Sequence, residues 1–198
     1  ATLMLNVAAG AFGDAAIAGM SIVTRISFFT YAMVIGLGQG FQPLCGFCYG
    51  AKLYGRVKEA FFFCIRCGTV FLAVCALIGF IFSTSIISIF RDDAAVVAVG
   101  SVALRWQVLS FPLVASIVLT NMLMQTIRKP VRANIVAAAR SGLFFIPLIF
   151  ILPYFFGLLG VEMCQMWADC CSFAVAVPIA WSAFRDMRRE QMELGKSH

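Results

Sequence analysis

Four long runs of residues without a charged side chain dominate this sequence. They cover residues 26–51, 67–90, 106–127 and 141–161. Each is longer than the roughly 20 apolar residues that an α-helix needs to cross the hydrocarbon layer of a membrane. The composition agrees, because 62% of the residues are hydrophobic and only 12% are charged, which is far from the balance of soluble proteins. The chain is therefore expected to be an integral membrane protein whose surface contacts the lipid bilayer.

The apolar runs and the turn residues between them predict an all-α, multi-pass bundle of about six transmembrane helices. The first apolar stretch is too short to cross alone, so we interpret it as the end of a truncated helix. We expect one transmembrane lobe over residues 1–198, with spans at about 1–12 (partial), 15–48, 60–90, 94–127, 131–154 and 158–184, and a tail at 185–198.

Basic residues in the predicted loops set the orientation, because Lys and Arg collect on the cytoplasmic side of a membrane. Alternate loops carry Lys52, Arg56 and Lys58; Arg128, Lys129 and Arg132; and, in the tail, Arg185, Arg188, Arg189 and Lys196. The turns between them contribute only Arg91. The C-terminus is therefore expected in the cytoplasm. This topology accounts for the net charge of +6, and no nucleic-acid partner is expected.

Two Cys-x-x-Cys pairs stand on either side of the first basic loop. Cys45 and Cys48 precede it, and Cys64 and Cys67 follow it, a spacing that a four-thiolate zinc site can use. The context nevertheless predicts a helical hairpin rather than the knuckle turns of a zinc ribbon. We therefore interpret these cysteines as small apolar residues inside helices, with a four-cysteine metal site as the alternative.

Charged residues within a predicted span are functional candidates, because they are costly in a bilayer. Asp169 and Arg140 lie at nearly the same depth, roughly 16 to 21 Å below the outer ends of consecutive antiparallel helices. We predict that they pair or share a hydrogen-bond network. Glu162 lies near the outer end of its helix, where we expect it to be solvated.

Polar residues form a stripe on the predicted helix at 94–127. Gln107, Asn121 and Gln125 point within about 40° of one another on an α-helix, and Ser110 lies about 60° to one side. Such a stripe is typical of a water-filled transport pathway, and equally of helices that pack through hydrogen bonds. The sequence leaves both interpretations open.

The segment GLGQGFQPLCGFCYGAKLYGRVKEA, residues 36–60, carries the most specific motif. It resembles the signature of the multidrug and toxic compound extrusion family, in which Gly-x-Gly-Gln-Gly-x-Gln-Pro leads into Tyr-Gly-Ala and a basic Arg-Val stretch. The matching residues are Gly38, Gln39, Gly40, Gln42, Pro43, Tyr49, Gly50, Ala51, Arg56 and Val57. Glycines permit close helix approach and proline interrupts helical hydrogen bonding, so we expect a helix break or hinge here.

The resemblance extends over essentially the whole chain, including FGD before the second helix, IFRDD in a later turn, and FFIPLIFILPYFFGLLGVE followed by WAD. Family members have twelve helices in two six-helix lobes. The chain resembles the second lobe with its first helix cut short, and a missing N-terminal lobe is the implied partner.

The resemblance also implies an activity. Members of the family are secondary active antiporters, in which inward flow of H⁺ or Na⁺ drives export of amphipathic, often cationic, drugs or toxic compounds by alternating access. It implies no enzymatic chemistry, no cofactor apart from the coupling ion, and a place in the bacterial inner membrane. Two alternatives from other classes remain: a half-size, non-catalytic membrane subunit or scaffold, and a membrane protein with a metal site made by the four cysteines.

Acidic residues on helices seven and ten are associated with cation coupling in this family. The counterpart of helix ten, at 94–127, has no acid after its start. Asp169 is therefore the deep carboxylate candidate for coupling, and Arg140, Gln107, Asn121 and Gln125 are candidates for the substrate or ion pathway. Asn6, on the surviving part of helix seven, is a further candidate.

Overall fold

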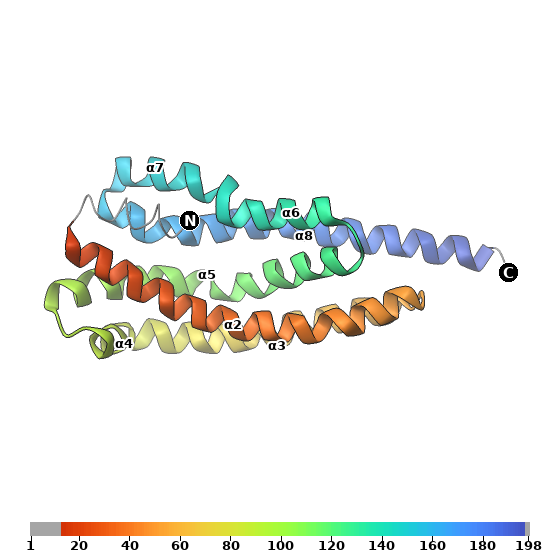
Figure 1. Ribbon diagram of the computed structural model, residues 1–198, viewed down its shortest axis with the longest axis horizontal. Helices are drawn as coiled ribbons and strands as arrows, with labels where there is room; N and C mark the ends of the chain where they lie inside the picture. The colour runs from red at the N-terminus through yellow and green to blue at the C-terminus, as the bar shows by residue number, and fades with distance from the viewer. Residues whose placement is uncertain (1–12, 197–198) are drawn as a thin grey trace.

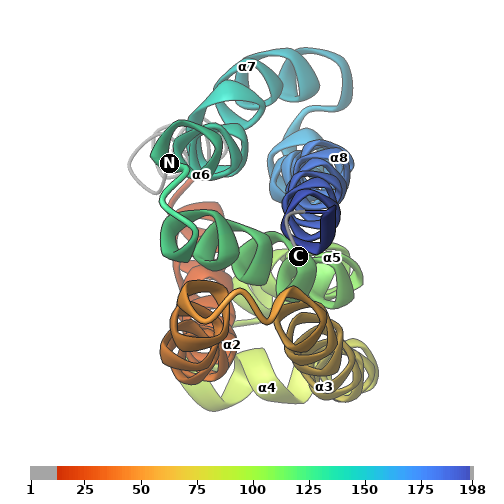
Figure 2. The same ribbon diagram turned by 90° about the vertical axis from the view of Figure 1, so that its right-hand side faces the viewer.

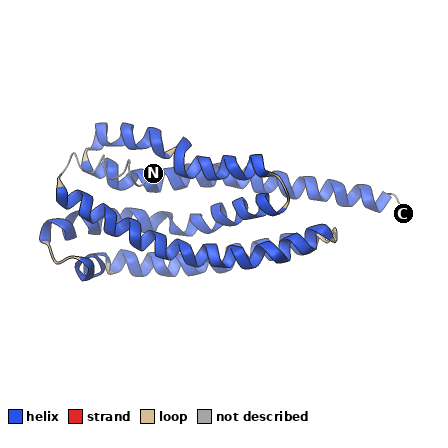
Figure 3. Cartoon of the chain, in the orientation of Figure 1, coloured by secondary structure: helices blue, strands red, loops and turns tan. Residues whose placement is uncertain are grey.

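The computed structural model describes residues 13–196, and over these residues it contains helices and turns but no strand (Figure 1, Figure 3). The chain is thus an all-α protein, as predicted. In chain order the elements are α2 (Asp14–Gly50), α3 (Tyr54–Ile81), α4 (Ser83–Phe90), α5 (Ala94–Thr126), α6 (Pro130–Ala138), the π-helical turn η1 (Ala139–Leu143), α7 (Phe145–Phe156) and α8 (Leu158–Lys196).

Helices α2, α3, α5 and α8 are each long and apolar enough to cross a membrane. Three consecutive pieces, α6, η1 and α7, occupy the region where the sequence predicts a single span at 131–154. The helix predicted over 60–90 is divided at Phe82 into α3 and α4. The predicted tail is not separate from its span, because α8 continues as one helix to Lys196.

Helix α5 forms the centre of the bundle and contacts α2, α3, α4, α6 and α8. Figure 2, which looks along the helices, shows these elements arranged around it. In its most apolar stretch 56% of the α5 residues are buried, against 22% to 33% in α2, α3 and α8. The outer helices instead expose large apolar side chains such as Phe28, Phe63 and Leu77. An apolar exterior of this kind is suited to lipid rather than water.

The basic loops lie at one end of the bundle, as the orientation argument requires (Figure 1). The α2–α3 turn, the α5–α6 turn and the end of α8 meet there. Lys129 Nζ and Arg132 Nη1 bind Asp186 Oδ2 at 2.6 and 3.1 Å. The hydrogen bond from Lys129, followed by that from Arg132, lowers the pKa of the Asp186 carboxyl below its ordinary value. These contacts tie the start of α6 to α8.

The helix break expected at Pro43 is absent, because α2 runs without interruption from Asp14 to Gly50. Proline removes one backbone hydrogen bond, here to the carbonyl of Gln39. The opposite face of the helix holds it in place, since Phe41 and Cys45 are buried on either side of the proline. The chain reverses only after Gly50, where Lys52 adopts a φ of 60°.

The turn between α7 and α8 is tight. Gly157 has a φ of 58°, in the region that side chains of L-residues avoid. A Cβ atom on Gly160 would overlap the backbone carbonyl of Leu152. Glycine at position 160 therefore sets how closely α7 folds back on α8.

Replacing Gly160 with alanine is expected to lower the melting temperature, because the backbone of α7 must move at a cost of about 1–3 kcal/mol. Gly36→Ala is the matched control, since a Cβ at Gly36 meets no atom within 4 Å. Thermal unfolding of both variants in detergent checks this. Equal melting temperatures would show that the turn has room for a side chain.

Asp186→Asn is expected to destabilise the protein by about 1 kcal/mol or less at neutral pH, since the pair is partly exposed. Because the folded-state pKa is lowered, the stabilisation is present above the unfolded value of about 3.9 and is lost as the pH falls through the folded one. Melting temperatures of wild type and variant should therefore converge once the pH falls below the folded-state pKa. Asp92→Asn, at an exposed turn, controls for the loss of a charge. A gap between wild type and Asp186→Asn that stays constant with pH would contradict the assignment.

Candidate functional site

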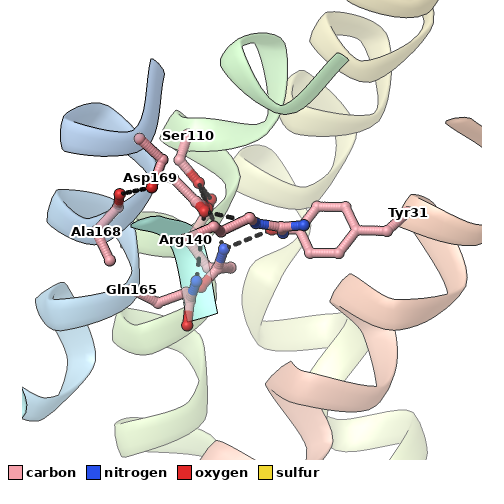
Figure 4. A network of polar contacts seen from close by, with 8 residues as sticks. Tyr31, Ser110, Arg140, Gln165, Ala168 and Asp169 are labelled. Atoms are coloured by element: carbon pink, nitrogen blue, oxygen red, sulfur yellow. Dashed lines mark hydrogen bonds and ion pairs between the residues drawn. The ribbon is translucent and has the colours of Figure 1, made fainter. Parts of the chain in front are cut away.

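The carboxylate of Asp169 lies at the centre of a polar network inside the bundle (Figure 4). Its side chain is 0% exposed. Oδ1 accepts hydrogen bonds from Arg140 Nε at 3.0 Å and from Gln165 Nε2 at 3.3 Å, and Oδ2 accepts one from Ser110 Oγ at 2.9 Å. The structure thus places Asp169 and Arg140 in direct contact, as their matched depths predict.

The π-helical turn η1 carries Arg140 to this position. Phe144 N donates to Ala139 O at 3.2 Å, an i to i+5 bond that widens the turn by one residue. The guanidinium passes between Asp169 and the aromatic ring of Tyr31 on α2, with its Cζ atom 4.5 Å from the ring centroid. Figure 4 shows the guanidinium between the two groups. The cation–π contact with Tyr31 and the ionic contact with Asp169 together stabilise the positive charge of Arg140.

Two residues of the predicted polar stripe belong to the same network. Gln107 Nε2 donates to Tyr31 Oη at 2.8 Å and lies 3.4 Å from Ser110 Oγ. Gln107 and Ser110 are both buried. The network therefore joins α2, α5, η1 and α8 through their side chains.

The other two stripe residues line a cavity of about 270 Å³ between α2, α5, α6 and η1. Gln125 Nε2 donates to Asn121 Oδ1 at 2.6 Å. Arg140 also lines this cavity, with Ile35, Ile117, Val118, Met122, Val136 and Ala137 supplying apolar walls. Since the side chain of Arg140 is 21% exposed, it connects the buried carboxylate with the open cavity. The stripe therefore matches both interpretations in part: Gln107 and Ser110 pack helices through hydrogen bonds, and Asn121 and Gln125 line a cavity.

The signature residues from Gly38 to Gly50 lie along α2, Ala51 lies in the turn after it, and Arg56 and Val57 lie on α3. The hydrogen bonds of the network involve none of them. A Cβ on Gly38 would overlap Met122 Sδ, so this glycine allows α2 to approach α5. Gln39, Gly40, Pro43 and Gly50 are exposed, and Gln42 and Tyr49 are half-buried. Asn6 lies outside the described residues.

The cysteine pairs do not gather into one site. Cys45, Cys48 and Cys64 are buried in an apolar cluster with Phe41 and Phe61, whereas Cys67 is exposed. Over residues 13–196, no three His, Cys, Asp or Glu side chains lie close enough to share a metal ion. The geometry thus gives the alternative of a four-cysteine metal site no support.

Glu162 differs from its prediction. It is only 4% exposed, not solvated. Among the described residues, its Oε2 atom has no hydrogen-bond partner. It precedes Asp169 by two helical turns on the same face of α8, because seven residues span nearly two full turns. The seven-residue spacing from Asp169 indicates that Glu162 faces the interior. Its position near the end of the helix suggested solvation instead.

The comparisons with known proteins agree with this architecture of a multi-pass helical lobe. A family model described as MatE matches residues 1–151. The chain belongs to the MatE family.

Named relatives and solved structures extend the match. The chain is 28% identical over 180 residues to the multidrug export protein MepA of Staphylococcus saprophyticus, and 29% identical to MepA of Staphylococcus aureus strain N315; each match covers 90% of this chain and 39% of the relative. The structure matches the MATE transporter VcmN of Vibrio cholerae in the bent form with a TM-score of 0.85 at 19% identity, over 91% of this chain and 41% of that one. A MOP superfamily transporter from Pyrococcus furiosus gives 0.88 at 15% identity, over 94% and 42%. The chain thus spans about two fifths of these relatives, about the extent of one lobe.

Glu162→Gln is expected to raise the melting temperature, because Oε2 is buried without a hydrogen-bond partner among the described residues, and an ionised carboxylate there costs free energy on the order of 1 kcal/mol or more. Glu59→Gln, on the exposed surface of α3, is the matched control and should leave the melting temperature unchanged. Thermal unfolding in detergent at neutral pH measures both. A fall for Glu162→Gln would show that this carboxylate makes a stabilising contact instead.

Proposed function

We propose that this chain is one lobe of a cation-coupled antiporter that exports amphipathic, cationic compounds across the bacterial inner membrane. Membership of the MatE family and the likeness to proteins named as multidrug exporters support this proposal. The partner is a second lobe, because the relatives are more than twice as long as the matched region. The basic end of the bundle, which includes the C-terminus of α8, faces the cytoplasm.

The coupling proposal rests on one observation: the hydrogen-bond acceptors around Ser110 outnumber its protons by one. The single hydroxyl proton of Ser110 has two acceptors within 2.9 Å, Asp169 Oδ2 and the backbone carbonyl of Gln107. When Asp169 is ionised, that proton can satisfy only one of them. When Asp169 is protonated, it donates to Ser110, and Ser110 donates to Gln107. The network thus accommodates one additional proton without rearranging its heavy atoms.

Protonation would act on the cavity through Arg140. With Asp169 neutral, the guanidinium loses its counter-charge while it still lines the cavity beside Asn121 and Gln125. The added positive charge repels a cationic substrate, which then leaves. Loss of the proton restores the ion pair and lets the next cation enter. Proton and substrate therefore exclude each other electrostatically, as antiport requires.

The surroundings of Asp169 favour H⁺ over Na⁺ as the coupling ion. Two of its three partners, Arg140 and Gln165, present N–H donors to the carboxylate. A hard metal cation is bound by several oxygen ligands and is repelled by a guanidinium. A proton on the Asp169 carboxyl needs only one hydrogen-bond acceptor, and Ser110 Oγ provides it.

The test is Asp169→Asn in the protein expressed from its natural gene and reconstituted into proteoliposomes. Efflux of a lipophilic cationic dye driven by a pH gradient is expected to fall to the level of empty vesicles. Asp186→Asn, which removes a paired carboxylate further along the same helix, should keep most of the activity. A proton gradient should also be more effective than a sodium gradient in wild type.

Stability separates a coupling role from a purely structural one. Asp169→Asn leaves Arg140 unpaired and is expected to cost about 3–5 kcal/mol. The double variant Asp169→Asn with Arg140→Gln restores neutrality, so it should regain stability without regaining proton-driven efflux. Unchanged efflux in Asp169→Asn would remove this residue from the mechanism. Recovery of efflux together with stability in the double variant would reduce the pair to a structural role.

A further inference from the structure

A groove of about 450 Å³ lies at the basic end of the lobe, between the first turns of α3 and the last part of α8. Tyr54 and Lys58 line it from α3, and Trp181, Arg185, Met187 and Arg188 from α8. The side chains of Tyr54 and Met187 are buried and form its floor. Figure 1 shows α8 continuing past the α2–α3 turn at this end of the bundle.

Contacts on both sides fix the groove. On the membrane side the ring of Phe184 packs against Phe61 and Phe62, with centroids 5.1 and 6.0 Å apart. On the other side Tyr54 Oη donates to Glu190 Oε2 at 2.8 Å. The two helices are therefore held at a defined separation, and the groove does not depend on mobile side chains alone.

The charge of the groove is uniformly positive. Lys58, Arg185 and Arg188 line it, and none of its lining residues is acidic. Within the described part of the chain, these three make no ion pair. The nearby carboxylates already have partners, since Glu190 accepts from Tyr54 at the side of the groove and Asp186 binds Lys129 and Arg132. A ligand that complements this lining is an anion.

The groove also opens toward the apolar part of α8. A second hollow of about 260 Å³ shares Trp181 and Arg185 with it and continues to Pro178 and Ser182. Trp181 is 72% exposed, at the level where the predicted span ends. Tryptophan at such a level typically lies at the boundary between lipid headgroups and acyl chains. The cations thus lie where a lipid headgroup would be, and Trp181 lies next to them, where the acyl chains would begin.

We propose that this groove binds the headgroup of an anionic phospholipid from the cytoplasmic leaflet. Lys58, Arg185 and Arg188 bind the phosphodiester, because Lys and Arg provide charge-assisted hydrogen bonds to phosphate oxygens. The acyl chains run past Trp181 toward Pro178. A free phosphate fits the cations equally well, but it makes no use of the apolar hollow.

Native mass spectrometry of the protein expressed from its natural gene tests this site. The probe is an equimolar mixture of phosphatidylglycerol and phosphatidylcholine added to the detergent-purified protein. Wild type is expected to retain phosphatidylglycerol preferentially. Each removed cation should weaken that retention by roughly fivefold, so Lys58→Ala shows a single loss and the double variant Arg185→Ala with Arg188→Ala a larger one.

Arg189→Ala is the matched control, because Arg189 is exposed on the same helix next to Arg188 but does not line the groove. It should keep the wild-type preference. An equal loss in this control, or none in the double variant, would overturn the site in favour of a diffuse basic surface. Displacement of the bound phosphatidylglycerol by millimolar inorganic phosphate would overturn the lipid as its ligand. Melting temperatures of all variants identify any loss caused by unfolding.

Discussion

Two opposite charges meet inside the apolar part of this lobe, and the helices around them are arranged so that neither is left alone. An isolated charge in such a medium costs several kcal/mol. Asp169 therefore needs Arg140, which lies in the π-helical turn η1, where the backbone is widened, and contacts the carboxylate from there. The same requirement brings Tyr31 on α2 and Ser110 on α5 into one network. A single electrostatic constraint thus sets the relative positions of four elements that are distant in sequence.

The network and the cavity form one unit because α5 contributes to both. Its N-terminal half supplies Gln107 and Ser110 to the buried side, and its C-terminal half supplies Asn121 and Gln125 to the open side. Pro112 lies between the two halves. Arg140 is shared, with one side toward the carboxylate and the other toward the cavity. An event at the buried carboxylate therefore changes the electrostatic potential of the cavity without a long pathway between them.

Much of the fold was predictable from the sequence, since hydrocarbon thickness and the cost of charge leave few choices for uncharged runs. The contact of Asp169 with Arg140 was also predicted, because equal depths on consecutive antiparallel helices allow the two side chains to meet and an unpaired charge is costly there; that they face each other is decided by the packing. Other features depend on tertiary packing. The π-helical turn, the unbroken helix through Pro43 and the burial of Glu162 are decided by neighbouring helices, which periodicity does not describe. The groove at Lys58 and Arg188 likewise requires two helix ends to meet.

Helix α8 extends without a break from the α7–α8 turn to Lys196, through both Asp169 and Arg188. The two residues are about 28 Å apart along the helix axis, so a small change in the tilt of α8 near Asp169 corresponds to a larger displacement at Arg188. A tilt of about 10° around Asp169 moves the far end by about 5 Å. A rearrangement of the ion pair that tilts α8 would therefore move its far end, where α8 meets the surface of the membrane. Conversely, a load that restrains the far end, such as lipid packing or membrane thickness, acts back on the buried charges, because coupling between two sites is reciprocal.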